Sequence, residues 1–246
     1  MHRGKTAVIT GASRGIGLEI VKTFAREHAC IYACSRSASP EYLSLLAELS
    51  ARYQVTIQSV CFDLSDCEAV QAAIKQIIRE SEYIDILVNN AGISYVKLFG
   101  MTRMDDLRRV FDVNYFAQLQ IIQMILKKMM KQRSGSIINI CSASGLENQP
   151  GGLVYGSSKA AFLYATKTLA VEYGKYGIRV NAVSPGFIQT DMWKDRDEKT
   201  QSEILSEIPL ARQGMPADVA EAVSFLASEK ASFITGRNII IDGGRV

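Results

Sequence analysis

Tyr155 and Lys159 lie four residues apart, a spacing that puts both side chains on one face of a helix. A free phenol ionises at a pH of about 10, so at neutral pH it is a poor acid–base catalyst. A neighbouring ammonium group favours the ionised phenolate and therefore makes the phenol a better proton donor. The spacing alone is a weak signal, because a half-buried tyrosine beside a solvated lysine on an ordinary helix has the same pattern.

Ser142 precedes this pair in the segment Ser142-Ala143-Ser144-Gly145, directly after an apolar run. A serine hydroxyl can donate a hydrogen bond to a carbonyl oxygen and so orient that carbonyl toward the phenol. Together the three side chains predict a site that delivers a proton to a carbonyl oxygen.

The elements that must position these residues alternate along the chain. Short apolar, β-branched runs predict strands at 6–10, 30–34, 55–62, 84–88, 136–141, 178–184 and 238–241. Helical patterns occur at about 15–28, 40–53, 66–80, 103–131, 153–174 and 216–227, and the longest of them has a candidate break near its start. The strands are continuously apolar, which indicates a parallel sheet covered on both faces.

No linker, repeat or low-complexity stretch divides the sequence. It therefore predicts a single doubly wound α/β domain over residues 1–246, with a substrate lid near 187–208 that includes short helices at 190–208. In such a fold, ligands bind at the carboxyl ends of the strands. The candidate groups follow that rule, because each comes directly after a predicted strand: 11–17, 89–92, Ser142 and Pro185-Gly186.

The turn after the first strand contains Gly11, Gly15 and Gly17, a spacing that differs from the GxGxxG fingerprint. Glycines permit a tight turn and a close approach of the backbone to a pyrophosphate. The helix that begins near Gly15 directs free N–H groups and partial positive charge toward that anion. We therefore expect a dinucleotide to bind here, although a plain strand-to-helix turn is the alternative. The other contacts expected from this turn are Ser13, Arg14 and Ile16.

After the second strand, folds that bind NAD usually present an acid to the ribose 2′-hydroxyl. This chain has Ser35-Arg36 there, and Arg14 lies in the glycine turn. Two guanidinium groups and a hydroxyl suit a 2′-phosphate, so the sequence predicts NADPH in preference to NADH; a merely solvated Arg36 is the alternative. Asp63, followed by Leu64, comes after the third strand, where it could accept a hydrogen bond from adenine or cap a turn.

The composition is that of an ordinary globular chain, with 48% hydrophobic residues, 22% charged residues and a net charge of +3. Acids and bases are mixed, which gives no reason to expect nucleic acid or an anionic membrane as a partner. No apolar run reaches transmembrane length, and the first predicted strand leaves no room for a secretory signal, so we expect a cytoplasmic protein.

The cysteines and histidines point to neither disulfides nor a metal. With an odd number and no CxxC pair, the cysteines are expected to be buried small hydrophobes in a reducing compartment. They are Cys30, Cys34, Cys61, Cys67 and Cys141. His2 and His28 belong to no cluster with ligand spacing, so no metal site is expected.

The order of these motifs resembles the short-chain dehydrogenase/reductase family over essentially the whole chain: glycine turn, Asn-Asn-Ala-Gly at 89–92, Ser142, Tyr-x-x-x-Lys and Pro-Gly at 185–186. The resemblance implies a catalytic tetrad of Asn114, Ser142, Tyr155 and Lys159. Ser142 stands at the usual thirteen residues before Tyr155, and Ser144 is a less suitable alternative.

The resemblance also implies the role of each group. Tyr155 would protonate the alkoxide oxygen as the nicotinamide delivers hydride, and Lys159 would assist it and hold the nicotinamide ribose. Ser142 would fix the carbonyl, and Asn114 would hold a water that links Lys159 to solvent. The remaining cofactor contacts that the resemblance implies are Asn90, Ala91, Gly92, Pro185, Gly186, Ile188 and Thr190.

Within the family, segments 181–192, 209–214 and 236–244 are similar to bacterial 3-oxoacyl-(acyl carrier protein) reductases, which implies reduction of a 3-oxoacyl thioester. Lys127, Lys128, Lys131 and Arg133 would then either dock an acidic carrier protein or complement a helix C-terminus.

Two alternatives to that function remain. Residues 93–104 lack the Asp and Arg-Met arrangement expected of the fatty-acid enzyme, so a reductase or dehydrogenase of a steroid, a sugar or another metabolite stays open. A catalytically silent, cofactor-binding regulatory protein on the same fold is the alternative from a different class.

The resemblance further implies a homotetramer that uses the apolar helices near 107–130 and 153–174.

Overall fold

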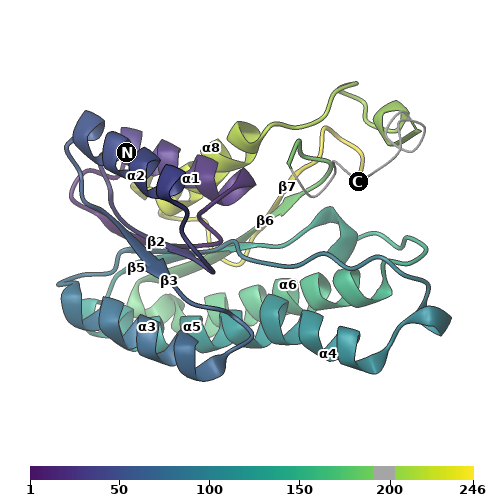
Figure 1. Ribbon diagram of the computed structural model, residues 1–246, viewed down its shortest axis with the longest axis horizontal. Helices are drawn as coiled ribbons and strands as arrows, with labels where there is room; N and C mark the ends of the chain where they lie inside the picture. Colours follow the sequence, from purple (N-terminus) through teal and green to yellow (C-terminus); the bar gives the residue numbers. More distant parts are fainter. Residues whose placement is uncertain (191–202) are drawn as a thin grey trace.

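The strands form one parallel sheet in the order β3-β2-β1-β4-β5-β6-β7, as the computed structural model of the chain shows (Figure 1). The structure describes residues 1–190 and 203–246. The strands are β1 (Thr6–Thr10), β2 (Cys30–Ser35), β3 (Ile57–Cys61), β4 (Ile86–Asn89), β5 (Gly135–Ile140), β6 (Ile178–Pro185) and β7 (Asn238–Ile241). Strand order reverses between β1 and β4, which is the switch point where such folds bind ligands.

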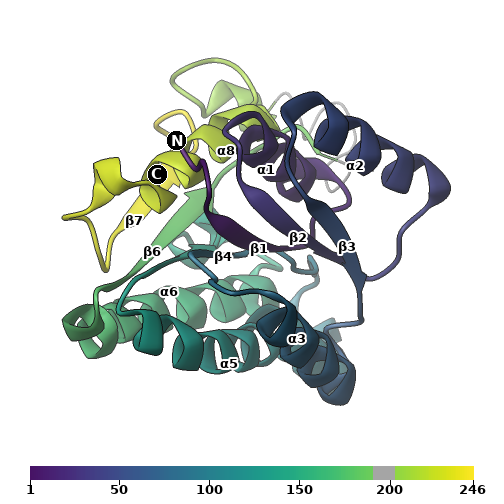
Figure 2. The ribbon, with the colours of Figure 1, turned by 90° about the vertical axis from the view of Figure 1, so that its left-hand side faces the viewer.

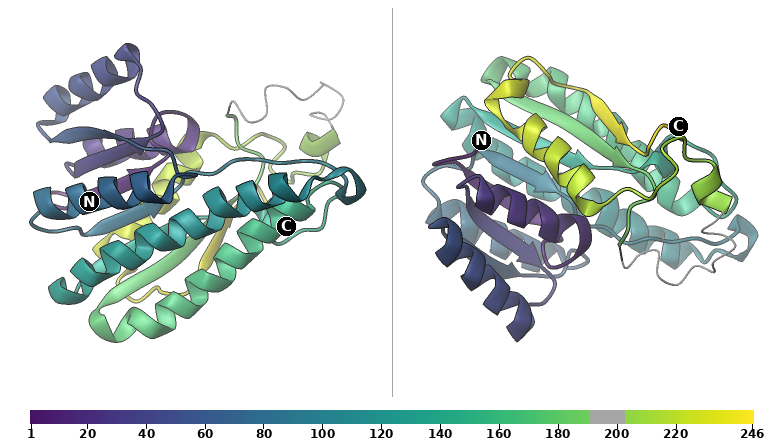
Figure 3. Two further views of the ribbon diagram at one scale, coloured as in Figure 1. Left: turned by 60° about the horizontal axis from the view of Figure 1, so that its bottom comes forward. Right: turned by 90° about the horizontal axis from the view of Figure 1, so that it is seen from above.

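Helices cover both faces of the sheet, as the views in Figures 2 and 3 show. One face carries α1 (Gly15–Arg26), α2 (Pro40–Tyr53) and α8 (Pro216–Ala227). The other carries α3 (Cys67–Glu80), α5 (Ala117–Gln132) and α6 (Leu153–Tyr173), with α4 (Met104–Phe111) ahead of α5. None of the helices in the described ranges is both long and apolar enough to cross a membrane.

The strands β1 to β6 feed two hydrophobic cores, because successive side chains point to opposite faces of a sheet. In β1, Ile9 packs in the core under α1, α2 and α8, whereas Val8 packs in the core under α3, α5 and α6. In β4, Val88 and Leu87 divide in the same way. This double burial explains the continuously apolar strands and confirms the predicted parallel α/β architecture.

The predicted elements differ from the observed ones mainly in one helix. The pattern at 103–131 is interrupted by a π-helical turn, η2 (Asp112–Phe116), between α4 and α5, near the candidate break. The predicted third strand, 55–62, is shorter at Ile57–Cys61. The predicted lid at 187–208 lies partly outside the described residues, which stop at Thr190 and resume at Glu203.

The burial predicted for the cysteines is wrong for two of the five. Cys61 and Cys67 are exposed, because β3 ends at Cys61 and α3 begins at Cys67, where the chain leaves the sheet. Cys34 and Cys141 are buried as predicted, and burial raises the pKa of the Cys141 thiol to about 12. The buried thiols therefore act as apolar packing groups.

His2 fastens the amino terminus to α1 and α8. Its side chain is 1% exposed, its ring lies 4.5 Å from that of Phe24, and its Nε2 lies 3.2 Å from both Ser224 Oγ and Glu27 Oε2. Burial lowers the pKa of His2 below its ordinary value of 6.5, with smaller contributions from the amino terminus and Lys5, while Glu27 opposes the shift. The folded chain therefore favours the neutral imidazole.

This lowered pKa predicts a loss of stability in mild acid. Because the unfolded chain binds a proton at His2 more readily than the folded chain, the free energy of unfolding should fall as the pH drops below 6.5. Urea unfolding between pH 7.5 and pH 5 would measure the loss. The slope should be shallower in His2→Gln than in the wild type. Equal slopes in the two proteins would contradict the assignment.

Candidate active site

The turn after β5 lies directly against the start of α6. Ser142 has an extended backbone, and its Oγ accepts a hydrogen bond of 3.2 Å from Ser144 N to cap the short helix η3 (Ala143–Gly145). A Cβ added at Gly156 would lie 2.5 Å from Ser144 O, and one at Gly145 would lie 3.0 Å from the backbone nitrogen of Ala160. This close contact brings Ser142 to the helix turns that carry Tyr155 and Lys159.

Lys159 is a buried cation at the centre of this cluster. Its side chain is 3% exposed, and Nζ donates a hydrogen bond of 2.8 Å to Ile140 O, at the end of β5. Nζ also lies 5.8 Å from the centroid of the Tyr155 ring. Within the described ranges no carboxylate pairs with it. A buried ammonium without an acid partner is expensive, which indicates that Lys159 is kept for chemistry and not for stability.

Asn114 sits in the π-helical turn η2 and joins α6 to the segment after β4. Its Nδ2 donates to Ile93 O (3.0 Å) and Ser158 Oγ (3.2 Å), and its Oδ1 accepts from Ile93 N (2.8 Å). The side chain is fully buried. These bonds use both amide hydrogens, so they make Asn114 a positioning residue; whether it also holds a water, as the resemblance implies, stays a prediction. Single π-turns inside helices are frequent at functional sites.

The glycine turn and the end of β4 are locked together. Asn90 Nδ2 donates to Thr10 O (3.0 Å) and Gly11 O (3.1 Å). Thr10 Oγ1 in turn accepts from the backbone nitrogens of Asn90 (3.0 Å) and Ala91 (3.1 Å). Gly11 and Gly17 allow this contact, because a Cβ at Gly11 would lie 2.8 Å from the Cα of Ala91 and one at Gly17 would lie 2.0 Å from Gly11 O.

The start of α1 fits an anionic ligand. Its N-cap, Arg14, makes no side-chain capping bond, whereas α2 and α3 are capped by Ser39 and Asp66. The first N–H groups of α1 are therefore free for a ligand, beside a glycine turn that lets the ligand approach the backbone. Thr190 covers this turn, since its methyl group would lie 3.3 Å from a Cβ at Gly15. A dinucleotide pyrophosphate suits these donors.

The residues predicted to bind the 2′-phosphate lie at the end of β2 and in the glycine turn, in two different settings. Arg14 and Arg36 are exposed, whereas Ser35 is buried and its hydroxyl donates to Ser37 O (3.0 Å). Asp63 Oδ1 accepts hydrogen bonds from Ser65 N (2.8 Å) and Ser65 Oγ (2.7 Å), so Asp63 caps a turn. These bonds lower the pKa of Asp63, and the positive charges of Arg36 and Arg109 lower it further. The contact of Asp63 with adenine stays a prediction.

The segment after β6 lies beside β7 and over the glycine turn. Gly186 N donates to Ile241 O (2.9 Å), and a Cβ at Gly186 would lie 2.6 Å from the Cβ of Asp242. Ile188 is buried and forms a bridge to Gly214. These contacts hold the segment between Pro185, where β6 ends, and Thr190, the last residue described before the gap. The remaining predicted contacts, Ser13, Ile16 and Leu64, are all partly exposed.

Three residues of the site were missed by sequence reasoning. Thr10 organises the backbone of Asn90 and Ala91, and Gln118 Nε2 donates to the carbonyl oxygens of Ala91 (3.1 Å) and Val113 (3.2 Å). Arg109, on α4, contributes a positive charge that lowers the pKa of Asp63. A polar residue that ends a buried strand was a usable signal for Thr10, but nothing in the sequence orients Gln118 or Arg109.

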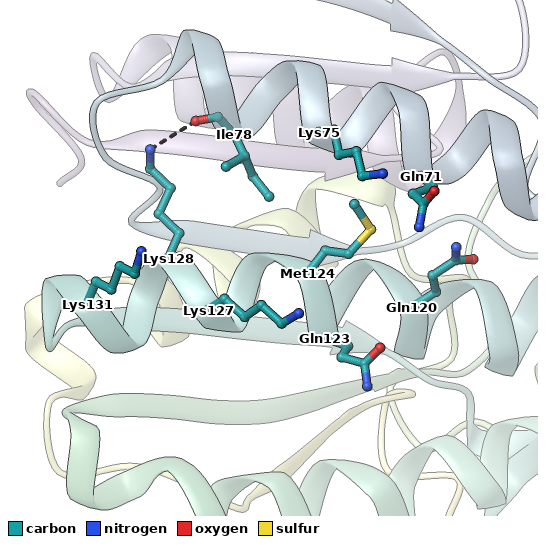
Figure 4. Close-up of a pocket in the computed structure, with 9 residues that line it drawn as sticks. All are labelled: Gln71, Lys75, Ile78, Gln120, Gln123, Met124, Lys127, Lys128 and Lys131. Atoms are coloured by element: carbon teal, nitrogen blue, oxygen red, sulfur yellow. Dashed lines mark hydrogen bonds between the residues drawn. The ribbon is translucent and has the colours of Figure 1, made fainter.

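A separate groove of about 490 Å³ lies between α3 and α5 (Figure 4). It is lined by Gln71, Lys75, Ile78, Gln120, Gln123, Met124, Lys127, Lys128 and Lys131. Lys131 follows Asn114 by 17 residues, which places it about 26 Å along the helix from the catalytic end.

Two of the four cationic side chains near the end of α5 donate hydrogen bonds to carbonyl oxygens at the ends of neighbouring helices. Lys128 Nζ donates to the carbonyl oxygens of Ile78 (3.1 Å) and Ser81 (2.5 Å) at the C-terminus of α3. Arg133 donates to Lys175 O (3.2 Å), just past the end of α6. The structural alternative to carrier docking, that these cations complement helix C-termini, is therefore confirmed for Lys128 and Arg133.

The fold and these residues define an oxidoreductase of the doubly wound dinucleotide-binding class. A family model described as Enoyl-(Acyl carrier protein) reductase matches residues 11–245. The 3-oxoacyl-[acyl-carrier-protein] reductase FabG of Thermotoga maritima is 38% identical over 99% of this chain and 98% of its own length. The reductase of the same name from Chlamydia trachomatis is also 38% identical, over 98% of this chain and 96% of its own. The chain belongs to the short-chain dehydrogenase/reductase family.

Solved structures agree with that assignment. A gluconate 5-dehydrogenase from Burkholderia cenocepacia, in complex with NADP and tartrate, superimposes with a TM-score of 0.92 at 30% identity, covering 99% of this chain and 95% of that one. A 3-oxoacyl-[acyl-carrier protein] reductase from Brucella melitensis superimposes with a TM-score of 0.90 at 33% identity, covering 99% and 91%.

Proposed function

We propose that this protein reduces the ketone of a 3-oxoacyl thioester to a secondary alcohol with NADPH. The observation that carries the proposal is the buried Lys159 ammonium, which has no acid partner among the described residues and lies beside Tyr155 and next to the turn of Ser142. A phenol, a hydroxyl and a cation on neighbouring segments suit an oxygen that gains negative charge during the reaction.

The chain's own residues would hold the dinucleotide at the glycine turn and act on the substrate oxygen. Gly11, Gly15 and the free N–H groups of α1 fit its pyrophosphate, and the bound cofactor supplies a hydride to the carbonyl carbon. Ser142 donates a hydrogen bond to the carbonyl oxygen. Tyr155 then transfers its phenolic proton to that oxygen, and the Lys159 charge stabilises the phenolate that remains.

The carbonyl substrate is favoured over a carbon–carbon double bond. Although the matching family model is described as an enoyl reductase, the full-length relatives at 37–38% identity are named 3-oxoacyl reductases. A serine hydroxyl and a phenol that act together, as proposed here, serve an oxygen better than an alkene carbon. Reduction or oxidation of a polar sugar acid is the second candidate, because gluconate 5-dehydrogenases are among the similar structures.

Comparing three substrates with NADPH tests the proposal. We expect oxidation of NADPH with a 3-oxoacyl thioester, and at most slow turnover with a 2-enoyl thioester or a 5-keto sugar acid. Fast reduction of either of the latter, with none of the 3-oxoacyl thioester, would reassign the substrate. Tight NADPH binding without turnover of any carbonyl would favour the silent regulatory protein.

Arg36 and Arg14 should make the protein prefer NADPH to NADH. Both guanidinium groups are exposed at the end of β2 and in the glycine turn, where a 2′-phosphate can reach them. Arg36→Ala should lower the ratio of kcat/KM for NADPH to that for NADH by about tenfold, the effect of one charged hydrogen bond. Arg52→Ala, which removes a surface partner of Glu48 on α2, is the control. A wild-type preference for NADH would refute the assignment.

We also infer a homotetrameric, cytoplasmic protein whose substrate is carried by an acyl carrier protein. Large apolar side chains on the outer surface of α6 support the oligomer: Tyr164 is 76% exposed and Val171 is 84% exposed. Phe116, ahead of α5, is 56% exposed. The relatives' names support the carrier-bound substrate. Lys131 is a poor docking point for that carrier, because it lies about 26 Å from Asn114 along α5.

A further inference from the structure

Residues 96–104, in the segment that follows β4, form an apolar rim. Five of its large side chains are more than half exposed within nine residues: Val96 (62%), Leu98 (58%), Phe99 (58%), Met101 (63%) and Met104 (51%). A contiguous exposed apolar patch on a protein surface usually marks a binding site. In Figure 1 this segment extends past the start of α4, at the same edge of the sheet as the segment that follows β6.

Hydrogen bonds tie the start of the rim to the catalytic machinery at two points. On one side, Ile93 is bonded through its N and O to Asn114, and a Cβ at Gly92 would lie 3.4 Å from Lys159 Nζ. On the other side, Lys97 N donates to Gly151 O (3.1 Å), four residues before Tyr155. Val96 follows Gly92 by four residues, so it lies within about 14 Å of it.

Two exposed leucines stand on the facing segment. Leu146 (45% exposed) follows the η3 turn of Ser142, and Leu153 (47% exposed) is the first residue of α6, two positions before Tyr155. A Cβ at Gly151 would lie 3.2 Å from the Val96 side chain, so the two segments touch. Apolar side chains therefore border the catalytic residues along both segments.

We propose that the rim binds the hydrocarbon tail of the acyl substrate, so that the protein prefers long-chain 3-oxoacyl thioesters to short ones; this rests on the proposed function. A polar substrate such as a sugar acid would gain nothing from five exposed apolar side chains. The tail of a fatty acyl chain gains about fourfold in binding for each methylene that it buries. The rim thus sets chain-length specificity at a site whose chemistry acts only on the carbonyl.

The test is a chain-length series. Twelve-carbon and four-carbon 3-oxoacyl N-acetylcysteamine thioesters are compared in the wild type and in the double variant Leu98→Ser, Phe99→Ser. The ratio of kcat/KM for the long to the short substrate should fall about tenfold, because contact with about two methylenes is lost. Phe99→Leu should keep the ratio near that of the wild type. Leu43→Ser, at an exposed leucine on α2, is the control and should not change it.

Binding and assembly are measured on the same proteins. The twelve-carbon 3-hydroxyacyl thioester should bind the double variant more weakly than the wild type by calorimetry. An unchanged ratio in the double variant would overturn the proposal. If the ratio is unchanged and light scattering also shows that the oligomer of the double variant has dissociated, the proposal is overturned as well. The rim would then be a contact between copies of the chain. If the wild type reduces no 3-oxoacyl thioester of any length, the proposed function itself fails.

Discussion

Tyr155→Phe is expected to lower kcat for carbonyl reduction by about 10²- to 10⁴-fold, the range for loss of a general acid. The variant keeps the ring and removes only the hydroxyl. No described residue forms a hydrogen bond with that hydroxyl, so its loss should leave the folded structure intact. Steady-state kinetics with a 3-oxoacyl thioester would measure the fall, and fluorescence titration would measure NADPH binding, which should persist.

Tyr164→Phe provides the control for this experiment. Tyr164 lies on the same helix but is 76% exposed and faces away from the cluster. It should retain wild-type turnover. Turnover close to that of the wild type in Tyr155→Phe would remove the phenol from its role as proton donor, whatever the effect on binding.

Gly17→Ala is expected to weaken dinucleotide binding by roughly 5- to 150-fold, which corresponds to a cost of about 1–3 kcal/mol for moving the glycine turn. On helix propensity alone, alanine in α1 should stabilise the fold by about 1 kcal/mol. However, its Cβ would lie 2.0 Å from Gly11 O and 2.5 Å from Asn90 Nδ2. The backbone of the glycine turn must therefore move, and overpacking of this kind costs about 1–3 kcal/mol. The steric effect outweighs the propensity gain.

Titration of NADPH and thermal unfolding would measure the two effects of Gly17→Ala. Gly174→Ala is the matched control, because a Cβ there would meet no atom within 4 Å and the backbone does not require a glycine. It should bind NADPH like the wild type. Unimpaired NADPH binding in Gly17→Ala would show that the cofactor does not depend on the close contact between β1, α1 and the end of β4.

The strands could be predicted from the sequence because both of their faces are buried. Val8 and Ile9 enter different cores, so the run remains apolar at every position. The turn residues were equally predictable, since a residue that follows a parallel strand lies at the ligand-binding edge. Ser142, Asn90 and Gly186 share that edge for this reason.

Two features of the site depend on contacts between distant segments, which the sequence does not show. The break in the helix at Asn114 accompanies bonds to Ile93 and Ser158, which lie 21 and 44 residues away. The burial of Lys159 follows from its bond to Ile140 O at the end of another element. The lone Tyr-x-x-x-Lys spacing could not distinguish this lysine from a solvated one, because burial is decided by how η3 packs on α6.

The central claim is that the Ser142, Tyr155 and Lys159 cluster directs reduction to the ketone carbon of a 3-oxoacyl thioester. The most direct test uses NADPH that carries deuterium at the transferable position and determines the product by mass spectrometry. We expect a 3-hydroxyacyl thioester with one deuterium on the carbinol carbon. Absence of this product, or deuterium in a saturated acyl chain formed from a 2-enoyl thioester, would contradict the assignment.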